Sequence, residues 1–183
     1  MCNNMNMNKS DLSFYISEDV KRRPKKVGII DLILHNEAWY IAQYVKHLRY
    51  VEYHKGKNGL HKLLYLYHWY KYKHLGFKLK MTIYPYTVGP GLRIYHSGDF
   101  LHIGENCSVG RNFTTSCGVV LGAMNAPITI GDNCTLNIGV KVIKPVTIGD
   151  NVIVGVNSVV TKDIPSNAVA VGIPAKVIKL RNG

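Results

Sequence analysis

Aliphatic residues recur at every sixth position through the second half of the chain. Starting at Ile130, six successive repeats carry an aliphatic residue there: Ile130, Leu136, Val142, Ile148, Val154 and Val160. The same period runs earlier through Ile103, Val109, Thr115 and Leu121, and before that through Val88 and Ile94. Short strands at a fixed interval, with no helical stretch between them, predict a parallel β-helix in which each coil covers the apolar face of the next.

Two steps of nine residues interrupt this period, from Ile94 to Ile103 and from Leu121 to Ile130. We therefore expect two insertions that leave the solenoid as loops. Glycine often follows the aliphatic residue, and we expect it to give a tight corner its backbone freedom. A repeat of about 18 residues per coil predicts about five coils. A doubly wound α/β fold is disfavoured, because its parallel strands need crossovers of a dozen or more residues.

The first part of the chain lacks the six-residue period and carries Trp, Tyr, Leu and Ile at helical spacings. We expect long helices over residues 36–54 and 58–75, separated by a glycine-containing linker. Asn58 is the expected N-cap of the second helix. A shorter helix is expected over residues 10–22, which end in a basic run.

Composition separates the same two parts. Residues 1–80 hold 15 Lys and Arg against 6 Asp and Glu, with 13 of the 18 aromatic residues and 4 of the 17 glycines. We therefore expect a basic, aromatic-rich α-helical region over residues 1–80 and the β-helix, with a C-terminal closing segment, over residues 81–183. The formal charge of +12 attracts anions such as nucleic acid, an acidic membrane face or a phosphate-bearing cofactor.

Targeting and redox signals favour a cytoplasmic protein. The first residues have no apolar core behind a basic end, and the longest apolar stretches are too short to cross a bilayer. The four cysteines show no paired spacing, and the chain is long enough to bury a core without disulfides. We expect a reduced protein with neither a signal peptide nor a membrane span.

Two segments resemble a known family. The run IGDNVIVG at residues 148–155, continuing to Lys179, resembles the closing segment of hexapeptide-repeat acyltransferases. The run VGPGLRIYHSG at residues 88–98 resembles the active-site segment of the serine acetyltransferase group within them. The resemblance covers residues 82–179 and implies a left-handed β-helix, a homotrimer, and transfer of acetyl from acetyl-CoA to an acceptor in clefts between subunits.

His96 is the expected catalytic residue. It lies in the first insertion, and it matches the family's catalytic histidine. Acyl transfer from a thioester to a hydroxyl needs a base, and imidazole titrates near neutral pH. Where the family carries an orienting aspartate, this chain has Met81 and Thr82. The orienting group is therefore Asp99 or a main-chain carbonyl, and we favour the carbonyl.

The acceptor site departs from the pattern of serine-specific members. These carry an aspartate before the catalytic histidine and an Arg-His pair in a later loop, whereas here Tyr95 precedes His96 and residues 122–127 are uncharged. A free amino acid would find few ionic contacts, so we expect a sugar or polysaccharide precursor as acceptor, with L-serine as the alternative. The expected substrate-binding residues are Tyr95, Asp99, His102 and Asn125.

The resemblance also implies where acetyl-CoA binds. The family lays the pantetheine arm along the groove between adjacent solenoids, against backbone groups at coil corners. A backbone N–H near Gly122 is expected to meet the oxyanion. Two lysines are placed to meet the nucleotide phosphates. The expected cofactor-binding residues are Gly122, Gly139, Val140, Gly155, Val156, Lys162 and Lys176.

No metal is expected. Four histidines in the helical region are seven residues apart: His47, His54, His61 and His68. This spacing suggests a metal site, but residues two helical turns apart lie about 10 Å from each other. We therefore expect that they do not share one ion.

Functions of other classes stay open. The basic, aromatic-rich region would suit nucleic-acid binding, although we favour aromatic side chains that pack the helices together. A non-catalytic hexapeptide scaffold protein is a further alternative. The basic run at residues 21–26 would suit peripheral contact with an anionic membrane beside a lipid-linked acceptor.

Overall fold

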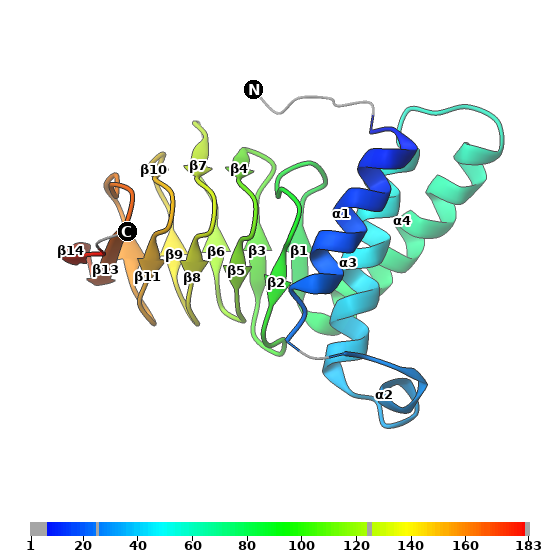
Figure 1. Cartoon of the computed structure of the whole chain (residues 1–183), viewed down its shortest axis with the longest axis horizontal. Helices are drawn as coiled ribbons and strands as arrows, with labels where there is room; N and C mark the ends of the chain where they lie inside the picture. Colours follow the sequence, from blue (N-terminus) through cyan, green and yellow to red (C-terminus); the bar gives the residue numbers. More distant parts are fainter. Residues whose placement is uncertain (1–6, 25, 124–125, 182–183) are drawn as a thin grey trace.

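Helices occupy one end of the molecule and a β-solenoid extends from them to the C-terminus (Figure 1). The computed structural model describes residues 7–24, 26–123 and 126–181. The four helices of these segments are α1 Lys9–Lys21, α2 Ile29–Ile33, α3 Glu37–His54 and α4 Leu60–Leu79. None of the described helices combines the length and the apolar character that crossing a membrane requires.

The two long helices and α1 confirm the expected helical elements within a few residues. The expected N-cap Asn58 is wrong, because Gly59 occupies the N-cap of α4 and makes no side-chain capping bond. The helix α1 begins with a capping box, in which Asn8 and Asp11 each bond the other's backbone N–H. The helix α2 was not predicted, since its five residues are too few to show a helical period.

Two tyrosines join the helical hairpin to the first coil of the solenoid. The rings of Tyr44 on α3 and Tyr72 on α4 stack with centroids 5.3 Å apart. The backbone N–H of Ile83 donates to the Tyr44 hydroxyl at 2.9 Å, and the Tyr72 hydroxyl donates to the Ile83 carbonyl at 2.6 Å. Aromatic packing is therefore confirmed here, while Tyr70 is 63% exposed and departs from that expectation.

The solenoid consists of three sheets whose strands come from successive coils. The first sheet has the order β1 Met81–Ile83, β3 Leu101–Ile103, β6 Val120–Leu121, β9 Lys141–Val142 and β12 Val159–Val160. The second has the order β10 Thr147–Ile148, β7 Ile128–Ile130 and β4 Cys107–Val109. The third has the order β14 Ala175–Leu180, β13 Ala168–Gly172, β11 Ile153–Val154, β8 Thr135–Leu136, β5 Thr114–Thr115 and β2 Arg93–Ile94. All these pairings are parallel except β13 with β14.

The six-residue column of aliphatic residues forms the solenoid core, as predicted. Every member is at most 5% exposed, from Val88 at 3% to Val160 at 1%, and Thr115 is fully buried with them. The winding makes about four turns rather than the expected five. The period overestimates the count because the chain leaves it after β12, where β13 and β14 turn back on each other as an antiparallel pair.

The corners of the coils show why glycine and asparagine recur. Glycine after the aliphatic residue provides space rather than backbone freedom: a Cβ on Gly131 would lie 2.8 Å from the backbone nitrogen of Asp150 in the next coil. The left-handed corner positions are largely asparagines, such as Asn133 at φ 57° and Asn151 at φ 57°. Their amides bond from coil to coil, with Asn133 Nδ2 donating to Asn151 Oδ1 at 3.2 Å.

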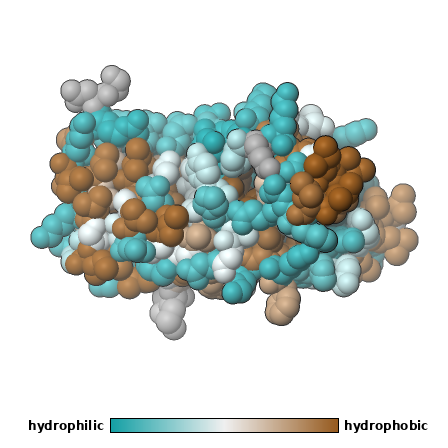
Figure 2. Space-filling model, turned by 90° about the horizontal axis from the view of Figure 1, so that it is seen from below, coloured by the Kyte–Doolittle hydropathy of each residue, from teal (hydrophilic) through white to brown (hydrophobic). Residues whose placement is uncertain are grey.

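Apolar side chains also gather on the surface of α2. Ile29, Ile30, Ile33 and Leu34 are each at least 68% exposed. Figure 2 views the molecule from the side on which α2 protrudes and shows a hydrophobic patch near that end.

Candidate active site

The first insertion places His96 at an edge of the solenoid. The third sheet's strand β2 ends at Ile94 and the first sheet's strand β3 begins at Leu101, so residues 95–100 cross from one sheet to the other. The His96 side chain is 62% exposed. It lies outside the packed interior and is open to solvent, which a group that acts on a diffusing substrate requires.

The His96 imidazole contacts a carboxylate from the helical region. The Nδ1 atom of His96 lies 3.2 Å from Oε1 of Glu37, the first residue of α3. The other Glu37 oxygen accepts from the Ser97 hydroxyl at 3.0 Å. The contact at Nδ1 is thus neither of the two groups expected, Asp99 or a main-chain carbonyl, because the helices fold back over the insertion and bring in a residue 59 positions earlier.

A cavity of about 240 Å³ opens beside His96, between the end of α1, the start of α3 and strand β2. Its polar lining includes Arg23, Glu37, Arg93 and His96, and much of the rest is aliphatic. The cavity is large enough for a small molecule and places charged groups of both signs next to the imidazole.

Two arginines, Arg23 and Arg93, line this cavity together with the acidic residues Asp19 and Glu37. The Nε atoms of Arg22 and Arg93 are buried and have no hydrogen-bond partner among the described residues. Burial, and then the charge of Arg93, lowers the pKa of the Arg22 guanidinium. Unsatisfied buried N–H groups are costly, and of these two arginines only Arg93 lines the cavity.

The predicted acceptor residues do not all lie together. Tyr95 lines the cavity and its ring stacks under the Arg93 guanidinium, 4.5 Å from the ring centroid. Asp99 is exposed and accepts from the Phe100 backbone N–H at 2.9 Å. His102 lies on β3, where its ring stacks on Phe100 with centroids 5.6 Å apart, and burial lowers its pKa. Asn125 lies outside the described residues.

The predicted cofactor residues divide between two edges of the solenoid. Gly139, Gly155 and Val156 lie where the chain passes from the third sheet to the first, the same edge as the His96 insertion. Gly122 and Lys162 lie at the other end of the first sheet's strands, after β6 and β12. A Cβ on Gly122 would lie 4.0 Å from Cδ2 of His102, so His102 belongs to this second edge.

Hydrogen bonds within the solenoid already use several of the expected backbone groups. The Gly122 N–H donates to the Val142 carbonyl at 3.0 Å, and the Gly155 N–H donates to the Ala170 carbonyl at 2.9 Å. Val140 is fully buried, and its side chain packs in the core rather than at the surface. Lys162 and Lys176 are exposed, and Lys176 lies on β14 in the closing hairpin.

Sequence comparison matches the solenoid half of the chain. Residues 127–162 match the family model of the bacterial transferase hexapeptide, six repeats. A serine acetyltransferase of Staphylococcus aureus is 39% identical over 97 residues, which are 50% of this chain and 45% of that protein. A serine acetyltransferase of Bacillus pumilus is 37% identical over 102 residues, which are 53% of this chain and 46% of that protein. The chain thus spans about half the length of the curated relatives it matches.

Structural comparison extends the likeness to the helices. A serine acetyltransferase of Neisseria gonorrhoeae superposes with a TM-score of 0.69 at 20% identity, over 96% of this chain and 69% of that one. A serine acetyltransferase of Brucella abortus in complex with coenzyme A superposes with a TM-score of 0.64 at 21% identity, over 93% of this chain and 67% of that one. The fold is shared along nearly the whole chain. The resemblance seen in the sequence is therefore confirmed as a resemblance: residues 127–162 match the hexapeptide-repeat model, and the chain is similar to serine acetyltransferases in sequence over its solenoid half and in fold over nearly its whole length.

Proposed function

We propose that the protein transfers the acetyl group of acetyl-CoA to the hydroxyl of a small acceptor, with His96 as general base. The observation that carries this proposal is the pairing of the exposed His96 imidazole with Glu37 at a distance of 3.2 Å, beside a cavity that both residues line. The likeness of the solenoid half to serine acetyltransferases supports the same reaction.

The pairing assigns roles to the two ring nitrogens of His96. Because Nδ1 faces the Glu37 carboxylate, a proton on Nδ1 is held there and Nε2 is left as the acceptor. His96 Nε2 takes the acceptor's hydroxyl proton as its oxygen bonds to the thioester carbonyl carbon. The carbon–sulfur bond then breaks, and the imidazolium returns the proton to the departing sulfur. Glu37 stabilises the imidazolium between these steps.

Serine is the favoured acceptor, and this revises the preference for a sugar. The sequence showed few ionic contacts for an amino acid, whereas the cavity is lined by two arginines and two acidic residues: Arg23, Arg93, Asp19 and Glu37. The carboxylate of an amino acid could bind the half-buried Arg93 guanidinium through charge-assisted hydrogen bonds. A structure of the Neisseria gonorrhoeae neighbour contains serine, which supports this choice.

We also propose that the donor groove lies between two copies of the chain. The expected cofactor residues occupy two different edges of one solenoid, and only one of these carries His96. If solenoids pack side by side as a homotrimer, the second edge of one copy faces the His96 edge of its neighbour. We therefore propose a trimer in which acetyl-CoA lies between copies, with Lys162 near its phosphates.

Thiol release from acetyl-CoA tests the reaction and the acceptor together. We expect rapid release with L-serine and slow release with a panel of sugars and with serine methyl ester, which lacks the carboxylate. His96→Ala should lower kcat/KM about 10²–10⁴-fold while binding of CoA stays unchanged. A sugar that outperforms serine would replace the acceptor assignment and keep the reaction.

Two results would overturn the reaction itself. The first is no thiol release above spontaneous hydrolysis with any acceptor, which would favour a non-catalytic scaffold. The second is unchanged turnover by His96→Ala. The matched control is His74→Asn, because His74 is an exposed histidine on α4 outside the cavity lining, and its turnover should equal that of the unmodified chain.

A further inference from the structure

Four histidines of the helical hairpin form two pairs between α3 and α4. The Nδ1 atom of His47 lies 2.8 Å from Nδ1 of His68, and Nδ1 of His54 lies 2.8 Å from Nδ1 of His61. The reversed order of the partners shows that the helices are antiparallel. A spacing of seven residues, which separates histidines along one helix, therefore brings each of them opposite a histidine of the other helix.

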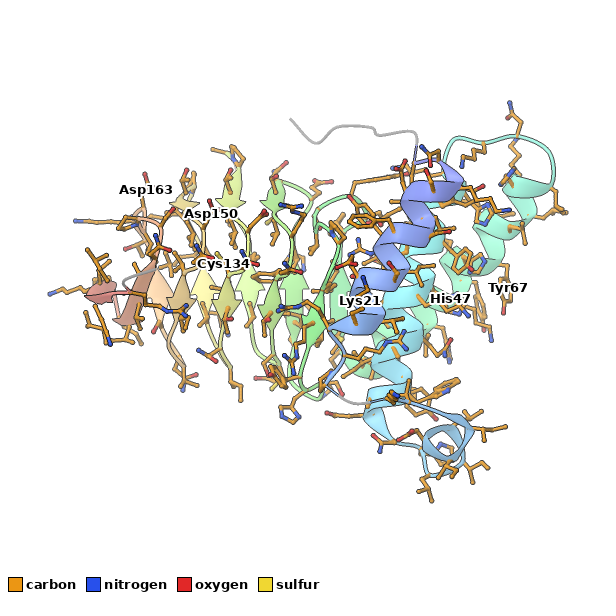
Figure 3. The ribbon with its side chains drawn as sticks, viewed as in Figure 1. Lys21, His47, Tyr67, Cys134, Asp150 and Asp163 are labelled. Carbon is orange, nitrogen blue, oxygen red and sulfur yellow. The ribbon has the colours of Figure 1, made fainter. Side chains whose placement is uncertain are left out.

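The pairs are closely packed and stand at an accessible groove. His47 is 9% and His54 is 5% exposed, and their partners on α4 are half-buried. The rings of His54 and His68 stack with centroids 5.6 Å apart, so the two pairs are neighbours. An open groove of about 770 Å³ runs past them between α1, α3 and α4. Figure 3 labels His47 on α3 and Tyr67 on α4, whose rings meet edge to face at this groove.

The imidazoles of the first pair are neutral at physiological pH. Burial, followed by the charge of Lys46, lowers the pKa of His47 to about 4. Burial and the neighbouring histidines lower the pKa of His68 to about 4. Neutral imidazole is the form that binds metal ions. In each pair one facing nitrogen carries the proton and the other the lone pair. If the protonated ring changes to the Nε2–H tautomer, both rings stay neutral and both Nδ1 lone pairs are free for a metal ion.

We propose that each pair, His47 with His68 and His54 with His61, binds a divalent first-row transition-metal ion such as Zn²⁺, Ni²⁺ or Cu²⁺. Two imidazole nitrogens on one tetrahedral ion, each about 2.0–2.1 Å from it, lie about 3.3 Å apart. The pairs must therefore open by a few tenths of an ångström. Imidazole is a preferred ligand of these metals.

Each proposed site supplies only two protein ligands to its ion. Within residues 7–24, 26–123 and 126–181, no group of three or more His, Cys, Asp or Glu side chains is arranged to hold a metal. Water from the groove would therefore complete each coordination shell. Such two-histidine sites release their ion readily to a chelator. The proposal departs from the expectation that no metal is bound, but it keeps the expectation that the four histidines do not share one ion.

Calorimetric titration of tag-free protein with Zn²⁺ and with Ni²⁺ at pH 7.5 tests this proposal. We expect saturable uptake of one ion per pair, a rise in Tm, and reversal by a chelator. His68→Asn should remove the first site and His61→Asn the second, and each of these residues is the less buried member of its pair. His74→Asn on the same helix should bind as the unmodified chain does.

Spectroscopy of the unmodified protein keeps the proposal testable if a variant fails to fold. Bound Cu²⁺ should show nitrogen hyperfine splitting from two imidazoles in its electron paramagnetic resonance spectrum. Absence of saturable uptake, or uptake that persists in a folded His61→Asn/His68→Asn double variant, would show that the pairs are hydrogen bonds alone and would overturn the proposal.

Discussion

Arg49 on α3 is fully buried, and its Nε donates to Oδ2 of Asp19 on α1 at 2.8 Å. The same guanidinium donates to Glu52 and to the carbonyls of Val88 and Gly89. Burial lowers the pKa of Arg49, but Glu52 and then Asp19 outweigh it and raise that pKa overall. This ion cluster fastens two helices to the coil that carries strand β2 and, after it, His96.

Removing the central cation should therefore destabilise the whole protein. Arg49→Met leaves two buried carboxylates without a counterion, and we expect the free energy of unfolding to fall by roughly 3–5 kcal/mol. Chemical denaturation measures the change. The control is Arg111→Met, because Arg111 pairs with Asp132 in an exposed contact of 3.1 Å. This substitution should lower the free energy of unfolding by less than about 1 kcal/mol. Equal losses in the two variants would contradict a structural role for the cluster.

Close stacking of the coils makes a second prediction. A Cβ on Gly131 would lie 2.8 Å from the Asp150 backbone nitrogen and 2.9 Å from the Gly149 carbonyl carbon. Since backbone atoms of the next coil cannot move independently, Gly131→Ala should lower the free energy of unfolding by about 1–3 kcal/mol.

The matched control for the stacking prediction is Gly28→Ala. Nothing lies within 4 Å of a Cβ built on Gly28, so its effect should stay within about 0.5 kcal/mol. Thermal melting of both variants compares them directly. A Gly131→Ala protein that melts like the unmodified chain would show that the coils are less tightly stacked than the distances indicate.

The solenoid was predictable because its signal is local. Every residue of the six-residue column from Val88 to Val160 is buried, so the repeat itself shows which side chains face the interior. Predicting the solenoid therefore needs no knowledge of contacts between distant parts of the chain. The nine-residue steps likewise marked the loop of His96. The count of coils failed because the closing hairpin of β13 and β14 leaves the period that was being counted.

The surroundings of His96 were not predictable in the same way. Glu37 reaches it across 59 residues, and in the sequence it is an ordinary acidic residue in the first turn of a helix. The cavity needs Arg23 from the end of α1 and Arg93 from β2, whose meeting depends on how the helices dock. The sequence predicted a neutral acceptor because it does not reveal that Arg23, Arg93 and Glu37 line one cavity.

Acid should destabilise the helical hairpin through its first histidine pair. Burial and neighbouring positive charges lower the pKa of His47 and of His68 to about 4, against an ordinary value of 6.5. Between these values the unfolded chain binds protons that the folded pair does not bind. The free energy of unfolding is therefore highest above about pH 6.5 and falls as the pH approaches 4. Urea midpoints measured from pH 7.5 to 4 should show this decline.

Carboxylates also lose stabilising contacts in acid, so the histidine contribution needs a variant. His68→Asn removes one titrating group and relieves its partner, and the slope of stability against pH between 6.5 and 4 should become smaller. His74→Asn, at an exposed position of the same helix, should leave the slope unchanged. Parallel curves for all three proteins would rule out the pair as the source of acid sensitivity.

Glu37 should act on turnover rather than on folding. Its contact with His96 is half-exposed, with 41% of the Glu37 side chain accessible, so Glu37→Gln should change the free energy of unfolding by less than about 1 kcal/mol. The amide keeps the size of the side chain but cannot stabilise the imidazolium as a carboxylate does, and we expect kcat to fall about 10-fold or more. A steady-state assay of acetyl transfer to serine, monitored through the release of the CoA thiol, measures kcat and KM separately. Glu18→Gln removes another partly exposed carboxylate, one that pairs with Lys21 on α1, and should leave kcat unchanged. If Glu37→Gln instead raised KM for serine alone, the carboxylate would be a contact of the substrate's ammonium group and not the partner that positions His96.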